Sequence, residues 1–272
     1  MKSYFKFLSR NKAYTFINIA GLVVSLMFII LMGDYTWRQY SIDSWHENAD
    51  RIYLMGSNED FFMWPQVAGD VKEMCPEVEK TCCVMSQNGR IKYGQREVTT
   101  EENDDCNIML VDSTFFQFFS FPLVQGNPQT VLDAPDKCVV TESLARQLFG
   151  NKNPIGETLQ IVGDRNVHLG NDDPYDSTLV YTVSGVVRDF DRTVLPNETQ
   201  LIVSIERFGQ VMGYNLTNNA FGYGPTGTCK DFLMLKPGTT LDGKKKAIDD
   251  YLSKNYKPWS RSEEHTSELQ SR

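Results

Sequence analysis

Near its N-terminus the chain reads Ile17-Asn-Ile-Ala-Gly-Leu-Val-Val-Ser-Leu-Met-Phe-Ile-Ile-Leu-Met32, and this stretch decides how the 272 residues are organised. No charged residue occurs from Ala13 to Gly33, and apolar residues surround the expected helix on every side. About 20 such residues are enough for a helix to cross the hydrocarbon core of a bilayer. The sequence therefore predicts a transmembrane helix over residues 13–33.

The charges on either side of this run indicate its orientation. Lys2, Lys6, Arg10 and Lys12 precede it, and Asp34 follows it. Because Lys and Arg are enriched in cytoplasmic segments beside membrane helices, the N-terminus is predicted to be cytoplasmic and the body extracytoplasmic. A cleaved signal peptide and a buried soluble helix are the alternatives. The run is longer than the apolar part of a signal peptide, about 7–15 residues, and no A-x-A-like cleavage site follows it.

Composition excludes two broad classes of protein. The net charge of −8 leaves no basic patch of the kind that binds nucleic acid. The content of 41% hydrophobic and 12% aromatic residues is enough for a packed core and is not that of a disordered chain. The length fits one large domain or two small ones.

The body, residues 34–260, alternates short strand-like and helix-like segments, which predicts an α+β fold of mixed α/β character in two subdomains. Strands are expected at residues 51–55, 82–85, 90–93, 106–111, 178–187, 200–204 and 232–235. Helices are expected at residues 66–74, 113–119, 141–149 and 241–256. Thr141 is placed to cap the third helix and Gly150 to end it. The last helix is expected to bury Ala247, Ile248, Tyr251 and Leu252.

Residues that could carry chemistry are few. His46 and His168 have no partner at the spacing of metal ligands, so a structural or surface role is expected for each. The six cysteines form no C-x-x-C pair. They are Cys75, Cys82, Cys83, Cys106, Cys138 and Cys229. We expect mostly free, buried thiols with at most one or two disulfides. The sequence predicts no catalytic, cofactor-binding or metal-binding residue.

The last residues have neither a hydrophobic period nor turn residues. Arg261-Ser-Glu-Glu-His-Thr-Ser-Glu-Leu-Gln-Ser271 resembles the in-frame translation of a common sequencing adapter. We therefore interpret residues 261–272 as a non-native tail, to be set aside when the fold is considered. The natural protein is then expected to continue beyond Ser260.

Several stretches resemble the MacB/FtsX-type permeases of ABC transporters, including their MacB-like periplasmic core domain. Residues 5–22 are similar to the opening of that family, a basic interfacial segment that leads into the first membrane helix. Four further motifs follow in the order of the family. They are Tyr40-Ser-Ile-Asp-Ser-Trp-His-Glu-Asn-Ala-Asp-Arg-Ile-Tyr53, Phe119-Ser-Phe-Pro-Leu-Val-Gln-Gly126, the pair Val140–Gly150 and Asn153–Thr158, and Tyr181-Thr-Val-Ser-Gly-Val-Val-Arg-Asp-Phe190.

The resemblance marks a set of structural motif residues and no binding site. They are Asp43, Arg51, Tyr53, Pro122, Gly126, Gly150, Pro154, Gly156 and Gly185. The glycines permit turns that other residues resist, and a proline fixes the bend between a helix and a strand. By the same resemblance, residues 1–12 are a cytoplasmic segment and residues 34–260 the periplasmic core domain.

The resemblance also implies a function. The chain would be the front part of a permease subunit in the bacterial inner membrane, without enzymatic activity of its own. Its partners would be a cytoplasmic ABC ATPase, which binds the ATP, a second permease copy in a dimer, and in some systems a periplasmic adaptor protein. No cofactor is expected in this chain. ATP hydrolysis would drive periplasmic movements for export, lipoprotein release or signalling.

Two other functions remain open at the level of sequence. A single-pass membrane sensor with an extracytoplasmic ligand-binding domain would need a second span and a cytoplasmic output domain downstream. An anchored structural protein would end near Ser260. The order of the family motifs favours the permease over both.

Overall fold

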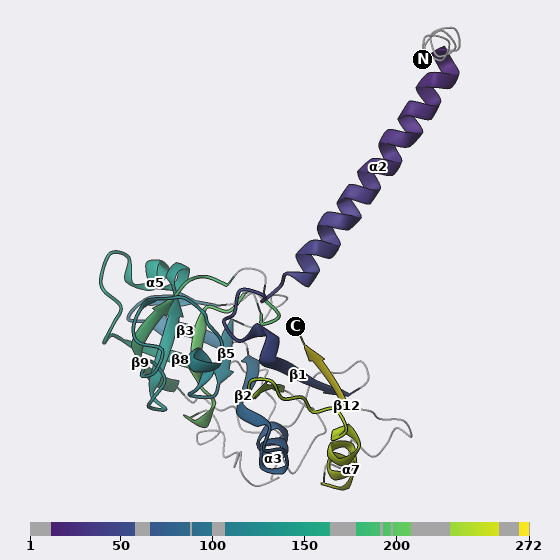
Figure 1. Cartoon of the computed structure of the whole chain (residues 1–272). Coiled ribbons are helices and arrows are strands. Elements are labelled where there is room, and N and C mark those ends of the chain that lie inside the picture. The colour runs from purple at the N-terminus through teal and green to yellow at the C-terminus, as the bar shows by residue number, and fades with distance from the viewer. Residues whose placement is uncertain are drawn as a thin grey trace, which may run out of the picture. The chain divides into compact units, whose positions relative to one another are not determined.

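The computed structural model describes residues 12–57, 66–87, 89–99, 107–163, 178–190, 193–196, 198–207, 229–255 and 267–271 (Figure 1). Contacts between Cα atoms divide the chain into two compact units, Met1–Ser44 and Trp45–Arg272. The first unit contains one long helix, and the second contains a sheet with its helices.

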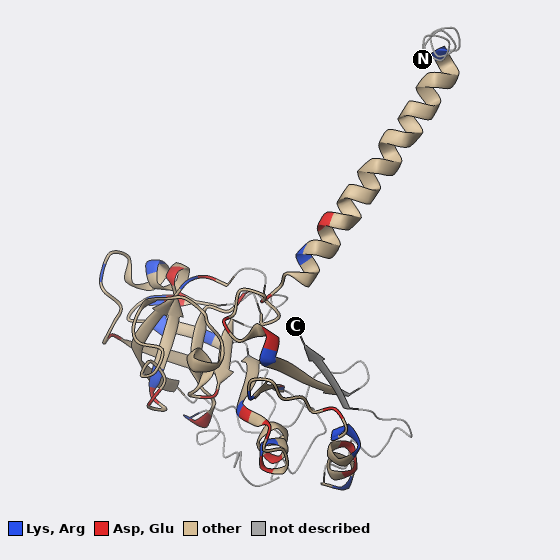
Figure 2. Cartoon of the chain, viewed as in Figure 1, with Lys and Arg blue, Asp and Glu red and all other residues tan. Residues whose placement is uncertain are grey.

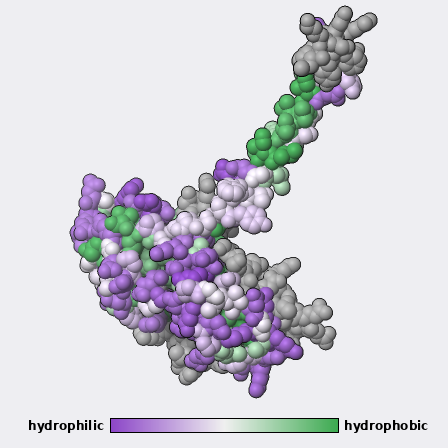
Figure 3. Space-filling view, viewed as in Figure 1, coloured by the Kyte–Doolittle hydropathy of each residue, from purple (hydrophilic) through white to green (hydrophobic). Residues whose placement is uncertain are grey.

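Helix α2, Lys12–Tyr40, is long and apolar enough to cross a membrane, and none of its residues is buried. Figure 2 shows charged residues only towards its two ends, and Figure 3 shows hydrophobic residues in green along its middle. The helix continues beyond Gly33, the predicted end of the span, to Tyr40. Within this extension Asp34 and Arg38 form an ion pair of 2.7 Å. Exposed Trp37 and Tyr40 lie in this extension. Such aromatic residues are enriched at membrane–water interfaces.

A polar turn over residues 41–44 ends the helix. The Ser41 N–H donates to the Trp37 carbonyl at 3.0 Å, and the Ser41 hydroxyl donates to the Arg38 carbonyl at 3.1 Å. Asp43 has a φ of 57°, in the left-handed region that Asp tolerates better than most residues. The turn therefore gives the last helical carbonyls hydrogen-bond partners and redirects the chain.

The strands of the second unit form one sheet, in the order β12-β1-β11-β2-β5-β10-β7-β9-β8-β3-β4, with β6 paired to β9. Two described pairs, β5–β10 and β7–β9, are parallel, and the other described pairs are antiparallel. The bounds are β1 Ile52–Ser57, β2 Val78–Gln87, β3 Gly89–Tyr93, β4 Arg96–Val98, β5 Ile108–Val111, β6 Leu123–Gln125, β7 Lys137–Thr141, β8 Thr158–Gly163, β9 Thr178–Val187, β10 Leu201–Ser204, β11 Cys229–Leu235 and β12 Ser267–Ser271.

Short helices cover the sheet. They are η1 Ala49–Arg51, α3 Val67–Met74, α4 Phe115–Phe118, α5 Glu142–Phe149 and α7 Lys245–Asn255. Figure 1 shows α5 beside β3, β8 and β9 at one end of the sheet, and α3 and α7 at the end that contains β1 and β2. At the start of α5 the Thr141 hydroxyl accepts the Leu144 N–H at 3.3 Å, and Gly150 ends the helix with a φ of 64°. Both ends agree with the sequence prediction.

The core follows from alternation along the strands, because successive side chains point to opposite faces of the sheet. One face packs against α4 in a cluster rich in phenylalanine, which includes Phe115, Phe118 and Phe232. The opposite face carries two clusters, one under α5 with Leu144 and one under α3 and α7. All three clusters lie within the second unit, so the body has a hydrophobic core of its own.

The structure confirms the mixed α/β fold and each predicted helix and strand to within a few residues. The described strands join into one sheet, and the two subdomains within the body remain a prediction. The structure differs from the sequence prediction in two ways. Strands β4, β6, β7, β8 and β12 were not predicted, and β12 lies in the tail 261–272 that was set aside when the fold was considered. Helix α7 begins at Lys245, four residues later than expected, and Ala247 is exposed while Ile248 and Leu252 are buried.

Candidate functional site: the junction segment

The residues that open the second unit, 45–51, link the sequence of α2 to the first strand of the sheet. We call them the junction segment. They contain the short helix η1 and are followed directly by β1. Polar and aromatic side chains of this segment make two separate sets of contacts with the body.

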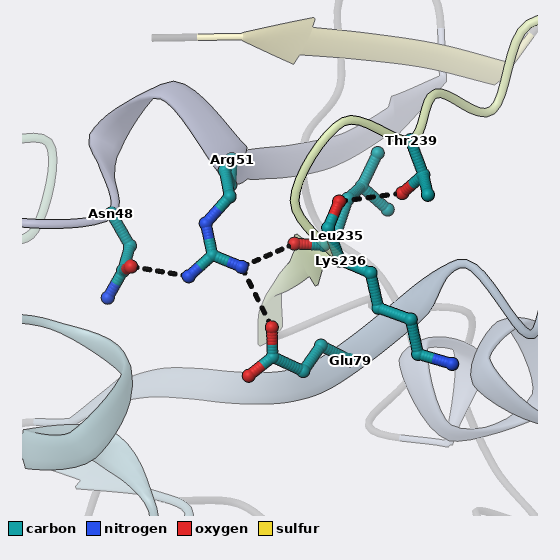
Figure 4. A network of polar contacts seen from close by, with 6 residues as sticks. All are labelled: Asn48, Arg51, Glu79, Leu235, Lys236 and Thr239. Carbon is teal, nitrogen blue, oxygen red and sulfur yellow. Dashed lines mark hydrogen bonds and ion pairs between the residues drawn. The ribbon is translucent and has the colours of Figure 1, made fainter.

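The first set centres on Arg51 (Figure 4). Its Nη1 donates to Glu79 Oε2 on β2 at 2.8 Å and to the backbone carbonyl of Leu235 on β11 at 2.8 Å. Its Nη2 donates to Asn48 Oδ1 in the junction segment itself. The Arg51 side chain is 20% exposed and that of Glu79 is 36% exposed, so water only partly screens the ion pair. One guanidinium thus joins the junction segment to two neighbouring strands.

The turn after β11 is held by further bonds beside Arg51. The Lys236 N–H donates to the Glu77 carbonyl at 2.8 Å. The Thr239 hydroxyl donates to the Lys236 carbonyl at 2.8 Å (Figure 4). The Lys244 ammonium donates to Glu77 Oε2 at 2.5 Å. This bond lowers the pKa of Glu77 and raises that of Lys244. The Leu235 carbonyl that Arg51 binds therefore lies at the end of β11, directly before a turn that several hydrogen bonds hold in place.

The second set centres on His46, which is 5% exposed. Its Nδ1 accepts the Ser120 N–H at 3.0 Å, and the Ser120 hydroxyl accepts the Glu47 N–H at 3.0 Å. Ser120 therefore donates one hydrogen bond to the junction segment, at His46, and accepts one from it, at Glu47. Because Nδ1 accepts a hydrogen bond here, it carries no proton in this arrangement.

Aromatic rings surround these hydrogen bonds. The His46 ring lies 3.9 Å from Trp45, 5.3 Å from Phe119 and 4.9 Å from Phe121, measured between centroids. Phe121 also packs edge-on against Phe190 at 4.6 Å. These are separations at which aromatic pairs add to the stability gained from burial. The second set thus anchors the junction segment in the phenylalanine-rich core cluster.

Two carboxyl groups with raised pKa values belong to the body, Asp231 within β11 and the half-buried Asp112 directly after β5. Asp231 on β11 is fully buried and accepts the Ala68 N–H at 3.3 Å. Burial, and next the nearby Asp112, raises its pKa from the usual 3.8 to about 8. Burial raises the pKa of Asp112 to about 6, although the Cys83 N–H donates to its Oδ2 at 2.7 Å and acts in the opposite direction. Both groups favour the neutral form more than exposed carboxyls do.

Three of the predicted motif residues lie at or near the junction segment. Arg51 makes the contacts described above. Tyr53 on β1 pairs in register with Leu233 and packs against the cluster under α3 and α7. Asp43 is buried and lies in the turn after α2, in the first unit.

Gly126 and Gly185 meet in a close approach between β6 and β9. A Cβ added to Gly126 would lie 2.6 Å from Val131 Cγ1 and 3.1 Å from the Cα of Gly185. A Cβ added to Gly185 would lie 2.9 Å from the same Val131 methyl. Gly126 also has a φ of 106°. Both positions therefore have no room for a larger residue.

Of the remaining motif residues, Gly150, Pro154 and Gly156 lie between α5 and β8, and Pro122 directly precedes β6. Gly150 N–H donates to the Arg146 carbonyl at 3.0 Å, and Gly156 N–H donates to the Val183 carbonyl on β9 at 2.8 Å. Pro154 between them is buried, and the exposed Pro122 accepts the Arg188 N–H at 3.1 Å. These residues belong to turns and strand ends of the body, and none of them is part of the junction segment.

Other predicted positions have simpler placements. Lys12 is the first residue of α2, whereas Lys2, Lys6 and Arg10 lie outside the described residues, as do His168 and Cys106. The other five cysteines are buried, and none of them forms a disulfide bond in the structure. They are Cys75, Cys82, Cys83, Cys138 and Cys229. Within the part of the chain that the structure describes, no group of three or more His, Cys, Asp or Glu could hold a metal ion.

Sequence reasoning missed the partners of the junction segment. A structural or surface role was expected for His46, but no contact partner was predicted for it. Ser120 and Glu79 were not predicted to contact the junction segment. The available signal was Ser120 itself, a polar residue between Phe119 and Phe121. A polar residue enclosed by core aromatics needs a hydrogen-bond partner, and the sequence does not say which residue supplies it.

Comparisons with known proteins agree with this architecture. The family model described as MacB-like periplasmic core domain matches residues 15–251. Comparison with curated proteins gives no match. A solved domain of a candidate permease protein from Porphyromonas gingivalis is similar with a TM-score of 0.56 and 19% identity, over 84% of this chain and 93% of that one.

Two further solved structures are similar at lower identity. The periplasmic region of MacB from Actinobacillus actinomycetemcomitans has a TM-score of 0.52 and 13% identity, over 82% of this chain and 89% of that one. The extracellular domain of the noncanonic ABC-type transporter YknZ from Gram-positive bacteria has a TM-score of 0.50 and 11% identity, over 80% and 99%. At these identities the structures show a shared fold. The family match extends over most of the chain, from α2 into α7, and the chain therefore belongs to the family of the MacB-like periplasmic core domain.

Proposed function

We propose that this chain is the front part of the permease subunit of an ABC transporter and has no enzymatic activity of its own. Residues 1–12 would be cytoplasmic, 13–33 would span the inner membrane, and 34–260 would form the periplasmic body. The tail 261–272 would be foreign to the natural protein. The observation that carries the proposal is the family match, which covers both the apolar helix and the body.

The chain would act as a mechanical element between an ATPase and the periplasm. A partner ATPase in the cytoplasm would hydrolyse ATP and displace the membrane helices of two permease copies, for export, lipoprotein release or signalling. A displacement that reaches residue 45 would enter the body through the two sets of contacts of the junction segment. Arg51 would transmit the displacement to β2 and β11, and His46 would transmit it to the stretch after α4.

Co-purification and ATP hydrolysis test this function. The complete permease gene, recovered from the source DNA, would be co-expressed with genes for ABC ATPases from the same source, and the complex reconstituted in lipid vesicles. We expect the ATPase to co-purify, and Arg51→Ala to reduce the response of ATP hydrolysis to the permease. The matched control is Arg146→Ala, since that side chain is 78% exposed and lies on α5. Failure of any ATPase to co-purify would contradict the proposal.

A further inference from the structure

The sequence of β1 is unusual for a strand near the edge of a sheet. At the far end of the sheet order lies β4, which has three residues, Arg96-Glu-Val98, and two of them are charged. Short, charged edge strands discourage pairing with further strands. In contrast, β1 has six residues, Ile52-Tyr-Leu-Met-Gly-Ser57, without a charge or a proline. It therefore lacks the features that protect β4.

The packing of β1 is also that of an interior strand. Leu54 is 4% exposed and belongs to the phenylalanine-rich cluster, whereas Met55 is 2% exposed and belongs to the cluster under α3 and α7. The strand is thus buried on both faces of the sheet. A strand of this kind without a neighbour on one side would leave a row of backbone N–H and C=O groups unpaired beside the core.

In the structure the neighbour on this side is β12, which belongs to the tail 261–272 (Figure 1). The two strands are antiparallel, with Tyr53 opposite Ser271 and Ser57 opposite Ser267. We propose above that this tail is foreign to the natural protein, so its sequence was not selected to fit β1. Main-chain hydrogen bonds supply the affinity when a strand is added to a sheet edge. The tendency to take up a strand therefore resides in β1.

We propose that the residues that follow Ser260 in the natural protein form a strand that covers the outer edge of β1. This inference rests on the proposed function, because it requires that the natural chain continue beyond Ser260. The place in the sequence is suitable: α7 ends at Asn255, and the tail that follows it extends to β1. A natural segment at the same position in the chain starts from the same point and has the same distance to cover.

The direction of this strand has a consequence for the function. Because β12 runs antiparallel to β1, its last residue lies opposite Tyr53, at the end where β1 begins. The junction segment directly precedes β1. A natural strand in this place would bring the chain back to the end of β1 at which the chain enters the sheet. The next membrane span would then be connected to the same strand as the first one.

Hydrogen exchange followed by mass spectrometry tests the proposal in detergent. Three proteins are compared: the complete natural permease, a form of it that ends at Ser260, and the 272-residue chain. The described members of the core clusters lie between Ile52 and Leu252, so the shortened form keeps them all. We expect peptides with β1 to exchange about ten times faster in the shortened form than in the other two proteins. Peptides with β4 should exchange equally in all three.

Proline variants of the 272-residue chain provide a matched control. Neighbouring residues of a strand direct their N–H groups to opposite sides, so the double variant Leu269→Pro, Gln270→Pro removes a donor on the side of β1. It should speed the exchange of β1 to the rate of the shortened form. The double variant Glu263→Pro, Glu264→Pro changes the tail outside β12 and should leave the exchange of β1 slow.

Three results would overturn the inference, and they differ in what they say of the proposed function. Fast exchange of β1 in the complete permease would show that no strand covers it, and the proposed function would stand. Slow exchange in the shortened form, together with a dimer in light scattering, would show that a second copy covers β1 instead. A stop codon near position 260 in the source DNA would contradict the proposed function and, with it, this inference.

Discussion

At the scale of single residues, the Arg51 guanidinium satisfies a carboxylate, a side-chain amide and a backbone carbonyl from three segments of the body. Replacing it with alanine leaves Glu79 and the Leu235 carbonyl without this donor in a partly buried setting. We predict that Arg51→Ala lowers the free energy of unfolding by about 1–2 kcal/mol, a range that allows for solvent screening of the ion pair.

Urea unfolding of residues 45–260 measures this change, since all three core clusters lie within that fragment. Arg146→Ala serves as the control. Its ion pair with Glu142 spans 3.7 Å on the surface, so the change should stay within about 0.5 kcal/mol. Equal effects of the two substitutions would mean that the Arg51 contacts do not hold the junction segment.

Asp231 predicts a pH dependence of stability. Its pKa is raised from 3.8 to about 8 in the folded chain, so the folded state keeps a proton that the unfolded chain releases. The stability that this proton contributes is complete below pH 3.8 and is lost as the pH rises through about 8. We therefore expect the free energy of unfolding to fall by roughly 1–2 kcal/mol from pH 6.5 to pH 8.5.

Asp231→Asn should flatten this dependence, because the amide keeps the shape of the carboxyl and does not titrate. The pKa of Asp112 is also raised, to about 6, so that residue acts mainly below this range of pH and remains in the variant. Urea unfolding at the two pH values, for the original chain and the variant, provides the comparison. An unchanged slope in Asp231→Asn would show that another group titrates.

At the scale of elements, the contact between β6 and β9 depends on two glycines without space for a side chain. We predict that Gly185→Ala destabilises the body by about 1–3 kcal/mol through overpacking against Val131. Gly69 on α3 is the opposite case, with nothing within 4 Å of an added Cβ. Gly69→Ala should stabilise the body by about 0.5–1 kcal/mol, the usual gain in a helix. Thermal unfolding of both variants tests the pair, and destabilisation by both would contradict this account.

Elements with strong local signals could be predicted from the sequence. Helix α5 has a cap at Thr141 and a stop at Gly150, and β9 is rich in β-branched residues, so both were found at nearly their observed bounds. In α7 the apolar residues Ile248 and Leu252 identified the buried face. The same pattern placed Ala247 on that face, but Ala247 is exposed. Alanine is small, so its burial contributes little to which face of the helix packs against the sheet.

Elements that depend on distant partners could not be predicted. Strand β7 lies in the centre of the sheet between β9 and β10, and its partners are far from it in the sequence. Strands β4 and β6 have three residues each, too few for a periodic pattern. The hydrogen bond from Ser120 to His46 joins residues 74 positions apart, and no spacing rule connects them.

At the scale of the whole molecule, the order of charges and apolar residues predicts a topology. We expect alkaline phosphatase fused after Ser260 to be active, because that enzyme folds only in an oxidising compartment. A fusion of green fluorescent protein at the same place, exported in unfolded form, should be dark. The reverse pattern would place the body in the cytoplasm.

Sequencing the source DNA across codon 260 is the decisive test of the proposal that this chain is the front part of a permease. We expect the reading frame to depart from the present tail at residue 261 and to continue through further apolar spans of about 20 residues. A stop codon near position 260, or a single further span followed by a cytoplasmic signalling domain, would contradict it.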